Sequence, residues 1–136
     1  MEYINQKNSR PISPHIGIYK PQVTSIFSIM HRISGIVNYI GLLVMIWWIV
    51  SISFVPGNPM DGFLWSFFAT AFGNLILIGW TLSLFFHMCT GIRHLLWDVG
   101  YGFSLKAVNI SAVVITLSAI VLTFFTWAII FSITRG

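Results

Sequence analysis

The sequence predicts an all-α integral membrane protein with three transmembrane helices, and its composition gives the first reason. Hydrophobic residues make up 57% of the 136 residues and charged residues only 7%, whereas ordinary globular proteins have about 25% charged residues. So few charges cannot cover a water-soluble domain, and lipid must therefore solvate most of the chain. The net charge of +4 comes from isolated cations beside apolar segments, which is typical of membrane topology and does not indicate nucleic-acid binding.

Three long apolar segments give the second reason. Each is longer than the roughly 20 residues that cross a hydrocarbon core, where every backbone polar group must be paired within its own segment, which favours helices. The stretch VPGNPMDG predicts a tight turn, and DVGYGFSLK predicts a second connection. We therefore expect an N-terminal inner-face segment over 1–24, transmembrane helices over 25–55, 63–97 and 106–134, a turn over 56–62 and a loop over 98–105.

The distribution of Lys and Arg predicts the orientation, because loops on the inner side carry an excess of positive residues. The C-terminus has only Arg135, and the first connection has Asp61 and no cation. The polar N-terminus also lacks the apolar core of a cleaved signal peptide. We expect a multi-pass protein of the bacterial inner membrane, or of the mitochondrial inner membrane if organelle-encoded, with its N-terminus in the cytoplasm or matrix. The cations on this inner side are Lys7, Arg10, Lys20, Arg32, Arg93 and Lys106.

The stretch FSIMHRISG brings polar side chains to the start of the first predicted helix. Ser28 and Arg32 are four residues apart and share a helix face, while His31 flanks this face and Gly35 extends it. Snorkelling to lipid phosphates explains Arg32 alone, but three polar side chains on one arc favour a binding site. A hydroxyl and a guanidinium both donate hydrogen bonds to carbonyl or carboxylate oxygens.

A second group of polar residues lies in FFHMCTGIRHLLWD, on the second predicted helix. His87, Gly91, His94 and Asp98 are spaced so that they form one stripe. A lone histidine at the depth of His87 usually makes an interhelical hydrogen bond; the alternative is axial ligation of a haem iron, with Gly91 leaving room for the macrocycle. Arg93 and His94 lie where haem propionates would be neutralised, although membrane topology explains Arg93 equally well. Asp98 is expected to orient His94 through a hydrogen bond.

The histidine count predicts a second chain. A haem with two axial histidines needs a partner for His87, but His31 lies close to the membrane surface and His15 lies outside the predicted helices. The second ligand is therefore expected from another subunit. The single cysteine, Cys89, excludes an internal disulfide and an all-cysteine metal site.

The motifs RPISPHIGIYK, SIMHRISG and HMCTGIRHLLWD together resemble those of the cytochrome b membrane anchors of succinate dehydrogenase, of the C type. The resemblance extends over nearly the whole chain. It implies a subunit of respiratory complex II, with a flavoprotein and an iron–sulfur subunit on the inner face and a second, D-type anchor completing the bundle. It also implies electron transport from succinate, an intermediate of the tricarboxylic acid cycle, through FAD and iron–sulfur clusters in the partners to ubiquinone, with haem b between the anchors.

The resemblance further implies roles for single residues. Ser28, Ile29 and Arg32 match the quinone site, and His87 matches the axial ligand of the haem iron. The D-type anchor is expected to supply the other axial histidine, so this chain alone holds no complete active site. The neighbours of the haem propionates are expected to be His31, Arg32, Arg93 and His94.

Two other functions fit parts of the sequence. A small membrane transporter or a structural assembly anchor would use Arg32 and His94 as a proton path or for packing, with neither haem nor a flavoprotein partner. The anchor of a fumarate-reducing relative would differ only in the physiological direction of the reaction. Purification of the tagged chain, followed by a visible spectrum, separates the haem-free functions from the others.

Overall fold

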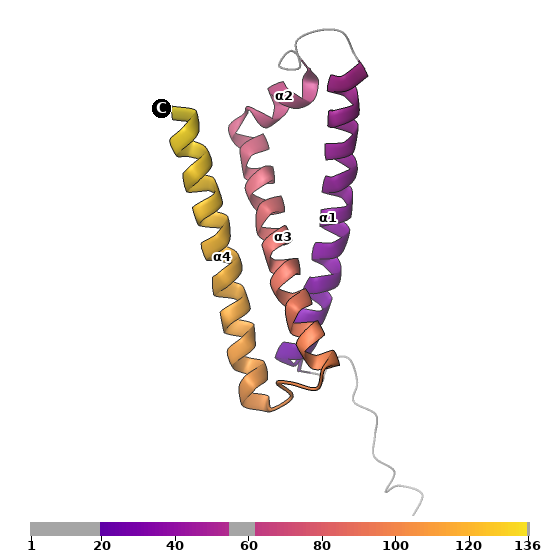
Figure 1. Cartoon of the computed structure of the whole chain (residues 1–136), viewed down its shortest axis with the longest axis vertical. Helices are drawn as coiled ribbons and strands as arrows, with labels where there is room; N and C mark the ends of the chain where they lie inside the picture. The colour runs from indigo at the N-terminus through magenta and orange to yellow at the C-terminus, as the bar shows by residue number, and fades with distance from the viewer. Residues whose placement is uncertain (1–19, 55–61, 136) are drawn as a thin grey trace, which may run out of the picture.

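A computed structural model describes residues 20–54 and 62–135 of the chain. Within these ranges all regular secondary structure is helical (Figure 1). The helices are α1 (Val23–Phe54), α2 (Phe63–Phe68), α3 (Ala71–Asp98) and α4 (Leu105–Arg135). Most of the expected N-terminal segment over 1–24 and of the expected turn over 56–62 lies outside the described residues.

Three of these helices are long and apolar enough to cross a membrane. The candidate spans contain 32, 28 and 30 residues, so each exceeds the length of a hydrocarbon core. The expected all-α fold with three transmembrane helices is confirmed. The stretch ISAVVITLSAIVLT is helical although its β-branched residues favour strands in water, because a lone segment in lipid can pair its backbone polar groups in no other way. The spans are Val23–Phe54, Ala71–Asp98 and Leu105–Thr134.

Helix α3 lies in the middle of the bundle, with α1 on one side and α4 on the other (Figure 1). We call the end where α1 begins and α3 ends the lower end, and the end near α2 the upper end. Helices α1 and α3 approach each other at the lower end and diverge toward the upper end (Figure 1). An apolar cavity of about 560 Å³ lies between them near the upper end. Its aromatic lining residues are Trp48, Trp65, Phe68 and Trp80.

A stripe of buried residues on α4, half of them small, provides the packing against α3. Its members recur every three or four residues, so they lie on one helix face, and small side chains let two helix backbones approach closely in lipid. Near the upper end of this stripe, Trp127 Nε1 donates a hydrogen bond to Thr81 Oγ1 at 3.4 Å. The buried members of the stripe are Val108, Ala112, Ile115, Ala119, Thr123 and Trp127.

The sequence predicts one continuous helix over 63–97, but the structure divides this span into α2 and α3. Thr70 caps α3, because its Oγ1 accepts a hydrogen bond from Gly73 N at 3.0 Å. A Cβ atom on Gly73 would overlap Phe67 O of α2. The lack of a side chain at Gly73 therefore lets α2 fold back on the start of α3. Because the apolar run continues through the break, hydropathy alone does not reveal it.

The connection between α3 and α4 is a short turn over residues 99–104, inside the loop expected over 98–105. Gly100 and Gly102 have φ angles of 92° and 84°, a region that glycine adopts without steric cost. Ser104 then caps α4, since its Oγ accepts a hydrogen bond from Ala107 N at 3.2 Å. The turn thus sets α4 antiparallel beside α3 (Figure 1).

Little of the apolar surface is buried by the described part of the chain. On α1 only Ser34 is buried, and large apolar side chains such as Trp47 remain 61% exposed. Exposed apolar surface on this scale indicates contact with lipid or with another protein. The most enclosed part of α1 is therefore the polar stretch that faces α3.

Candidate functional site between helices α1 and α3

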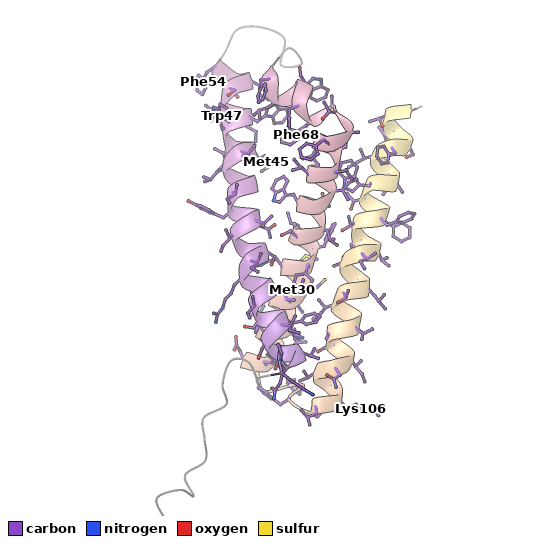
Figure 2. The ribbon with its side chains drawn as sticks, turned by 180° about the vertical axis from the view of Figure 1, so that it is seen from behind. Met30, Met45, Trp47, Phe54, Phe68 and Lys106 are labelled. Carbon is purple, nitrogen blue, oxygen red and sulfur yellow. The ribbon has the colours of Figure 1, made fainter. Side chains whose placement is uncertain are left out.

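The polar residues of the two sequence motifs meet between α1 and α3, toward the lower end. In Figure 2 the label of Met30, which precedes His31, marks the level of this cluster on α1. The imidazole rings of His31 and His87 stack, with centroids 4.0 Å apart and planes 8° apart. Gly35 allows this packing, because a Cβ atom there would lie only 3.1 Å from His87 Cε1.

Hydrogen bonds assign the proton of His87 to Nδ1. This nitrogen lies 3.0 Å from Ser34 Oγ and 3.1 Å from the backbone O of His31. Ser34 Oγ donates its single proton to the same backbone O at 2.7 Å, and a carbonyl O only accepts hydrogen bonds. His87 Nδ1 must therefore be the donor in both of its contacts, which leaves the lone pair of the ring on Nε2.

The same accounting applies to His31, which bonds to the fully buried Thr90. Thr90 Oγ1 donates its proton to the backbone O of Phe86 or His87, at 2.8 and 3.0 Å. In this arrangement Oγ1 accepts the hydrogen bond from His31 Nδ1, which lies 2.7 Å away. The lone pair of His31 is therefore also on Nε2.

This geometry fits a haem ligand at His87. Metal-binding histidines usually hold one ring N–H on a protein acceptor and present the other nitrogen to the metal. In the described residues no hydrogen bond reaches Nε2 of His87 or His31. Because the His31 and His87 rings are stacked and nearly parallel, the two histidines would not both hold one haem iron. No cluster of three or more His, Cys, Asp or Glu in the described ranges could hold a metal ion by itself.

Arg93 is 4% exposed and lies between two aromatic rings. Its Cζ is 4.9 Å from the ring centroid of Phe27 and 4.7 Å from that of Trp97. Its Nε, Nη1 and Nη2 atoms have no hydrogen-bond partner within the described chain. Aromatic faces stabilise a cation by roughly 0.5–2 kcal/mol, which is less than the cost of leaving a buried charge unpaired. A carboxylate from outside the described chain would satisfy this guanidinium.

His94 joins the same cluster through its ring contacts. Its centroid is 5.1 Å from that of His31 and 5.3 Å from that of Trp97. Asp98 is exposed at the end of α3, and no hydrogen bond or ion pair joins it to His94 among the residues that the structure describes. The structure therefore brings His31, His87, Arg93 and His94 together and leaves out Asp98.

The expected quinone residues lie on the first turns of α1, beside the cluster. Ser28 is half-buried, Ile29 is 56% exposed and Arg32 is exposed. In the described ranges Ser28 and Arg32 form no hydrogen bond with each other. Gly91 lies behind the cluster, since a Cβ there would be 3.9 Å from His31 Cε1. The Arg32 side chain is thus solvated or in contact with groups outside the described chain, and Ser28 is partly accessible beside it.

Three residues of the cluster were missed in the sequence. Ser34 follows His31 by three residues on α1, and Thr90 follows His87 by three residues on α3. Each hydroxyl therefore lies on the same face of its helix as the histidine that precedes it. That spacing is a signal that could have identified both. Phe27 carries no comparable signal, because its place against Arg93 depends on how α1 packs on α3.

Comparison with known proteins extends this picture to the whole chain. A family model described as "Succinate dehydrogenase/Fumarate reductase transmembrane subunit" matches residues 6–126. The succinate dehydrogenase cytochrome b556 subunit of Rickettsia prowazekii is 38% identical over 120 residues, which cover 88% of this chain and 92% of the relative. The b556 subunit of Paracoccus denitrificans is 32% identical over 138 residues, covering 96% and 98%. The cytochrome b560 subunit of Marchantia polymorpha is 37% identical over 122 residues, covering 83% and 85%.

These similarities confirm the resemblance inferred from the sequence motifs. The family match covers the first two candidate spans, reaches residue 126 within the third, and includes both histidine motifs. The relatives come from bacteria and from a plant, and all three have names of cytochrome b subunits of succinate dehydrogenase. The chain therefore belongs to the family of succinate dehydrogenase and fumarate reductase transmembrane subunits, among their cytochrome b membrane anchors.

Proposed function

We propose that this chain binds haem b together with a second, D-type anchor chain, and forms part of the quinone-reduction site of a succinate:ubiquinone oxidoreductase. The observation that carries the proposal is the hydrogen-bonding of His87, whose Nδ1 is a donor to Ser34 Oγ and to His31 O. Nε2 is thereby left as the metal-binding atom. When bound, haem b supplies a one-electron carrier next to the quinone.

The second axial ligand comes from the partner anchor. The stacking of His31 on His87 supports this assignment, because parallel rings cannot hold one iron from opposite faces. His31 instead packs against the ring of His87 and keeps its own Nδ1 on Thr90. A half-bundle that depends on a second chain also accounts for the large exposed apolar surface of α1.

Arg93 provides the counter-charge for a haem propionate. Its buried guanidinium has three nitrogen atoms without partners in the described residues, and carboxylates are the natural bidentate acceptors for arginine. Phe27 and Trp97 hold the guanidinium in place from either side. His31 and His94 lie next to this site. Arg32 directly follows His31 in the sequence of α1.

Ser28 and Arg32 bind the quinone head. Both are hydrogen-bond donors, and Arg32 stabilises the negative charge that develops on the quinone oxygens during reduction. Ile29, which lies between them in sequence and is largely exposed, contacts the quinone ring. This chain alone holds no complete active site.

The remaining redox groups belong to partner subunits. Electrons arrive from FAD in the flavoprotein through the clusters of the iron–sulfur subunit, both docked on the inner face of the bacterial or mitochondrial inner membrane. The family description also includes fumarate reductase. We propose the direction of succinate oxidation because the curated relatives named above are succinate dehydrogenase subunits.

Purification of the tagged chain from its native membrane tests this function directly. We expect the flavoprotein and iron–sulfur subunits to copurify and the reduced complex to show a b-type haem spectrum. The His87→Leu variant should lose or shift that spectrum, whereas Met88→Leu, its exposed neighbour, should not. Copurification of neither haem nor flavoprotein would favour a transporter or a structural anchor, and an unchanged spectrum in His87→Leu would remove His87 from the site.

A further inference from the structure

We propose that Ser34 is the positioning residue of the haem site: its hydroxyl holds His87 in the tautomer that presents Nε2 to the iron. This inference rests on the proposed function, since it assumes that His87 is the ligand. Ser34 is the one buried residue of α1 in the described ranges. Its hydroxyl is also the one side-chain group in these ranges that hydrogen-bonds to the imidazole ring of His87.

The geometry shows how a single hydroxyl can select a tautomer. Ser34 Oγ donates to the backbone O of His31 in the preceding turn of α1, at 2.7 Å. With its proton committed, the oxygen turns its lone pairs toward His87 Nδ1, 3.0 Å away on α3. An unprotonated Nδ1 would face lone pairs both on Ser34 Oγ and on the carbonyl O at 3.1 Å. The alternative tautomer would therefore lose two hydrogen bonds at once.

The same contact changes the electronic character of the ligand. Donation of the Nδ1–H to a protein acceptor raises the basicity of the opposite nitrogen, and loss of such a partner typically weakens metal affinity about 10–100-fold. In a Ser34→Ala variant the carbonyl O of His31 remains as an acceptor, so we expect the lower part of that range. A less basic ligand also stabilises the oxidised iron less, so the reduction potential should rise.

The experiment uses the purified four-subunit complex with Ser34→Ala, Ser34→Thr and Ser83→Ala. Ser83→Ala is the matched control, because Ser83 Oγ donates to the backbone O of Ser34 at 3.3 Å in the same helix interface, and the ring of His87 bonds to Ser34 and to His31 O instead. The measurements are the haem reduction potential, the low-spin electron paramagnetic resonance signal, and the rate of haem transfer to apomyoglobin. We expect a higher potential, a shifted signal and about tenfold faster haem loss in Ser34→Ala. Ser34→Thr and Ser83→Ala should match the native complex.

The outcomes separate this inference from the proposed function. If His87→Leu keeps the native haem spectrum, His87 is not the ligand and both fail. If His87→Leu loses haem while Ser34→Ala behaves like Ser83→Ala, only the role of Ser34 is overturned. Equal shifts in Ser34→Ala and Ser34→Thr would indicate a packing effect and also overturn it. Should the alanine variant fail to assemble, Ser34→Cys keeps a weak acceptor at the same place, and a native potential there would contradict the proposal.

Discussion

Gly41 of α1 lies so close to the indole ring of Trp80 on α3 that any Cβ atom at position 41 would overlap the ring. Both residues also line the apolar cavity near the upper end. Close approach at a glycine is a principal source of helix association in lipid. This contact therefore fixes how α1 crosses α3 and, through that crossing, where His87 lies relative to Ser34.

Substitution of Gly41 by alanine should loosen the helix pair. The added methyl group would force the Trp80 ring to move, and overpacking of this kind costs about 1–3 kcal/mol. Gly79→Ala is the matched control, because a Cβ there meets nothing within 4 Å. Thermal dissociation of the purified complex should occur at a lower temperature for Gly41→Ala and be unchanged for Gly79→Ala. Equal stability of the two variants would show that the Gly41–Trp80 contact is not a determinant of packing.

Substitution of Gly35 by alanine should disturb the ring of His87. The new Cβ would lie 3.1 Å from His87 Cε1, which is tighter than ordinary contact, so the imidazole must shift by a few tenths of an ångström. Gly91→Ala places its Cβ at an ordinary 3.9 Å from His31 Cε1. We therefore expect an altered haem absorption and paramagnetic resonance spectrum in Gly35→Ala and a native spectrum in Gly91→Ala. The reverse pattern would contradict the placement of His87.

Substitution of Arg93 should have opposite effects on haem binding and on the haem-free protein. Arg93→Leu removes the proposed propionate partner, so haem content should fall. It also removes a buried charge without partners in the described chain, so the haem-free complex should gain stability, by about 1–4 kcal/mol. Arg93→Lys keeps the charge but loses the planar fork, so its haem content should be intermediate.

Haem content by pyridine haemochrome and thermal dissociation of haem-depleted complex are the measurements for Arg93. Lys106→Leu serves as the control, because it removes an exposed cation near the same end of the bundle. Native haem content in Arg93→Leu would exclude a contact between this guanidinium and a propionate.

Substitution of Ser28 or Arg32 should impair quinone reduction selectively. Ser28→Ala and Arg32→Leu each remove a proposed donor to the quinone oxygens, and loss of one preorganised donor typically lowers turnover about 10²-fold. Succinate-dependent reduction of an artificial dye, which takes electrons before the membrane subunits, should stay native. Comparison of the two activities in the purified complex is the measurement. Full quinone turnover in both variants would reject the site, leaving snorkelling as the role of Arg32.

The sequence was sufficient for the architecture because lipid simplifies the problem. Length and hydropathy identify the spans of α1, α3 and α4, since a membrane admits helices and rejects isolated strands. The break between α2 and α3 escaped the same reasoning, because the residues around Thr70 and Gly73 stay apolar or small. It depends on one hydroxyl cap and one close backbone contact, neither of which hydropathy measures.

The candidate site was predictable in its residue types but not in its pairing. Spacing on single helices grouped His87 with His94, and in the structure both rings contact that of His31. It also suggested a contact between Asp98 and His94, although in the described structure His94 packs against His31 and Trp97 instead. Contacts between helices depend on how α1 is rotated and shifted against α3, and no pattern within one helix encodes that arrangement.

The apolar cavity near the upper end has a consequence for proton access. Its lining residues include no titratable side chain, so the cavity offers no side chain that could relay a proton. We therefore expect protons to reach the space between α1 and α3 from the lower end. Under the proposed function, the protons consumed in quinone reduction would then be drawn from a single aqueous compartment.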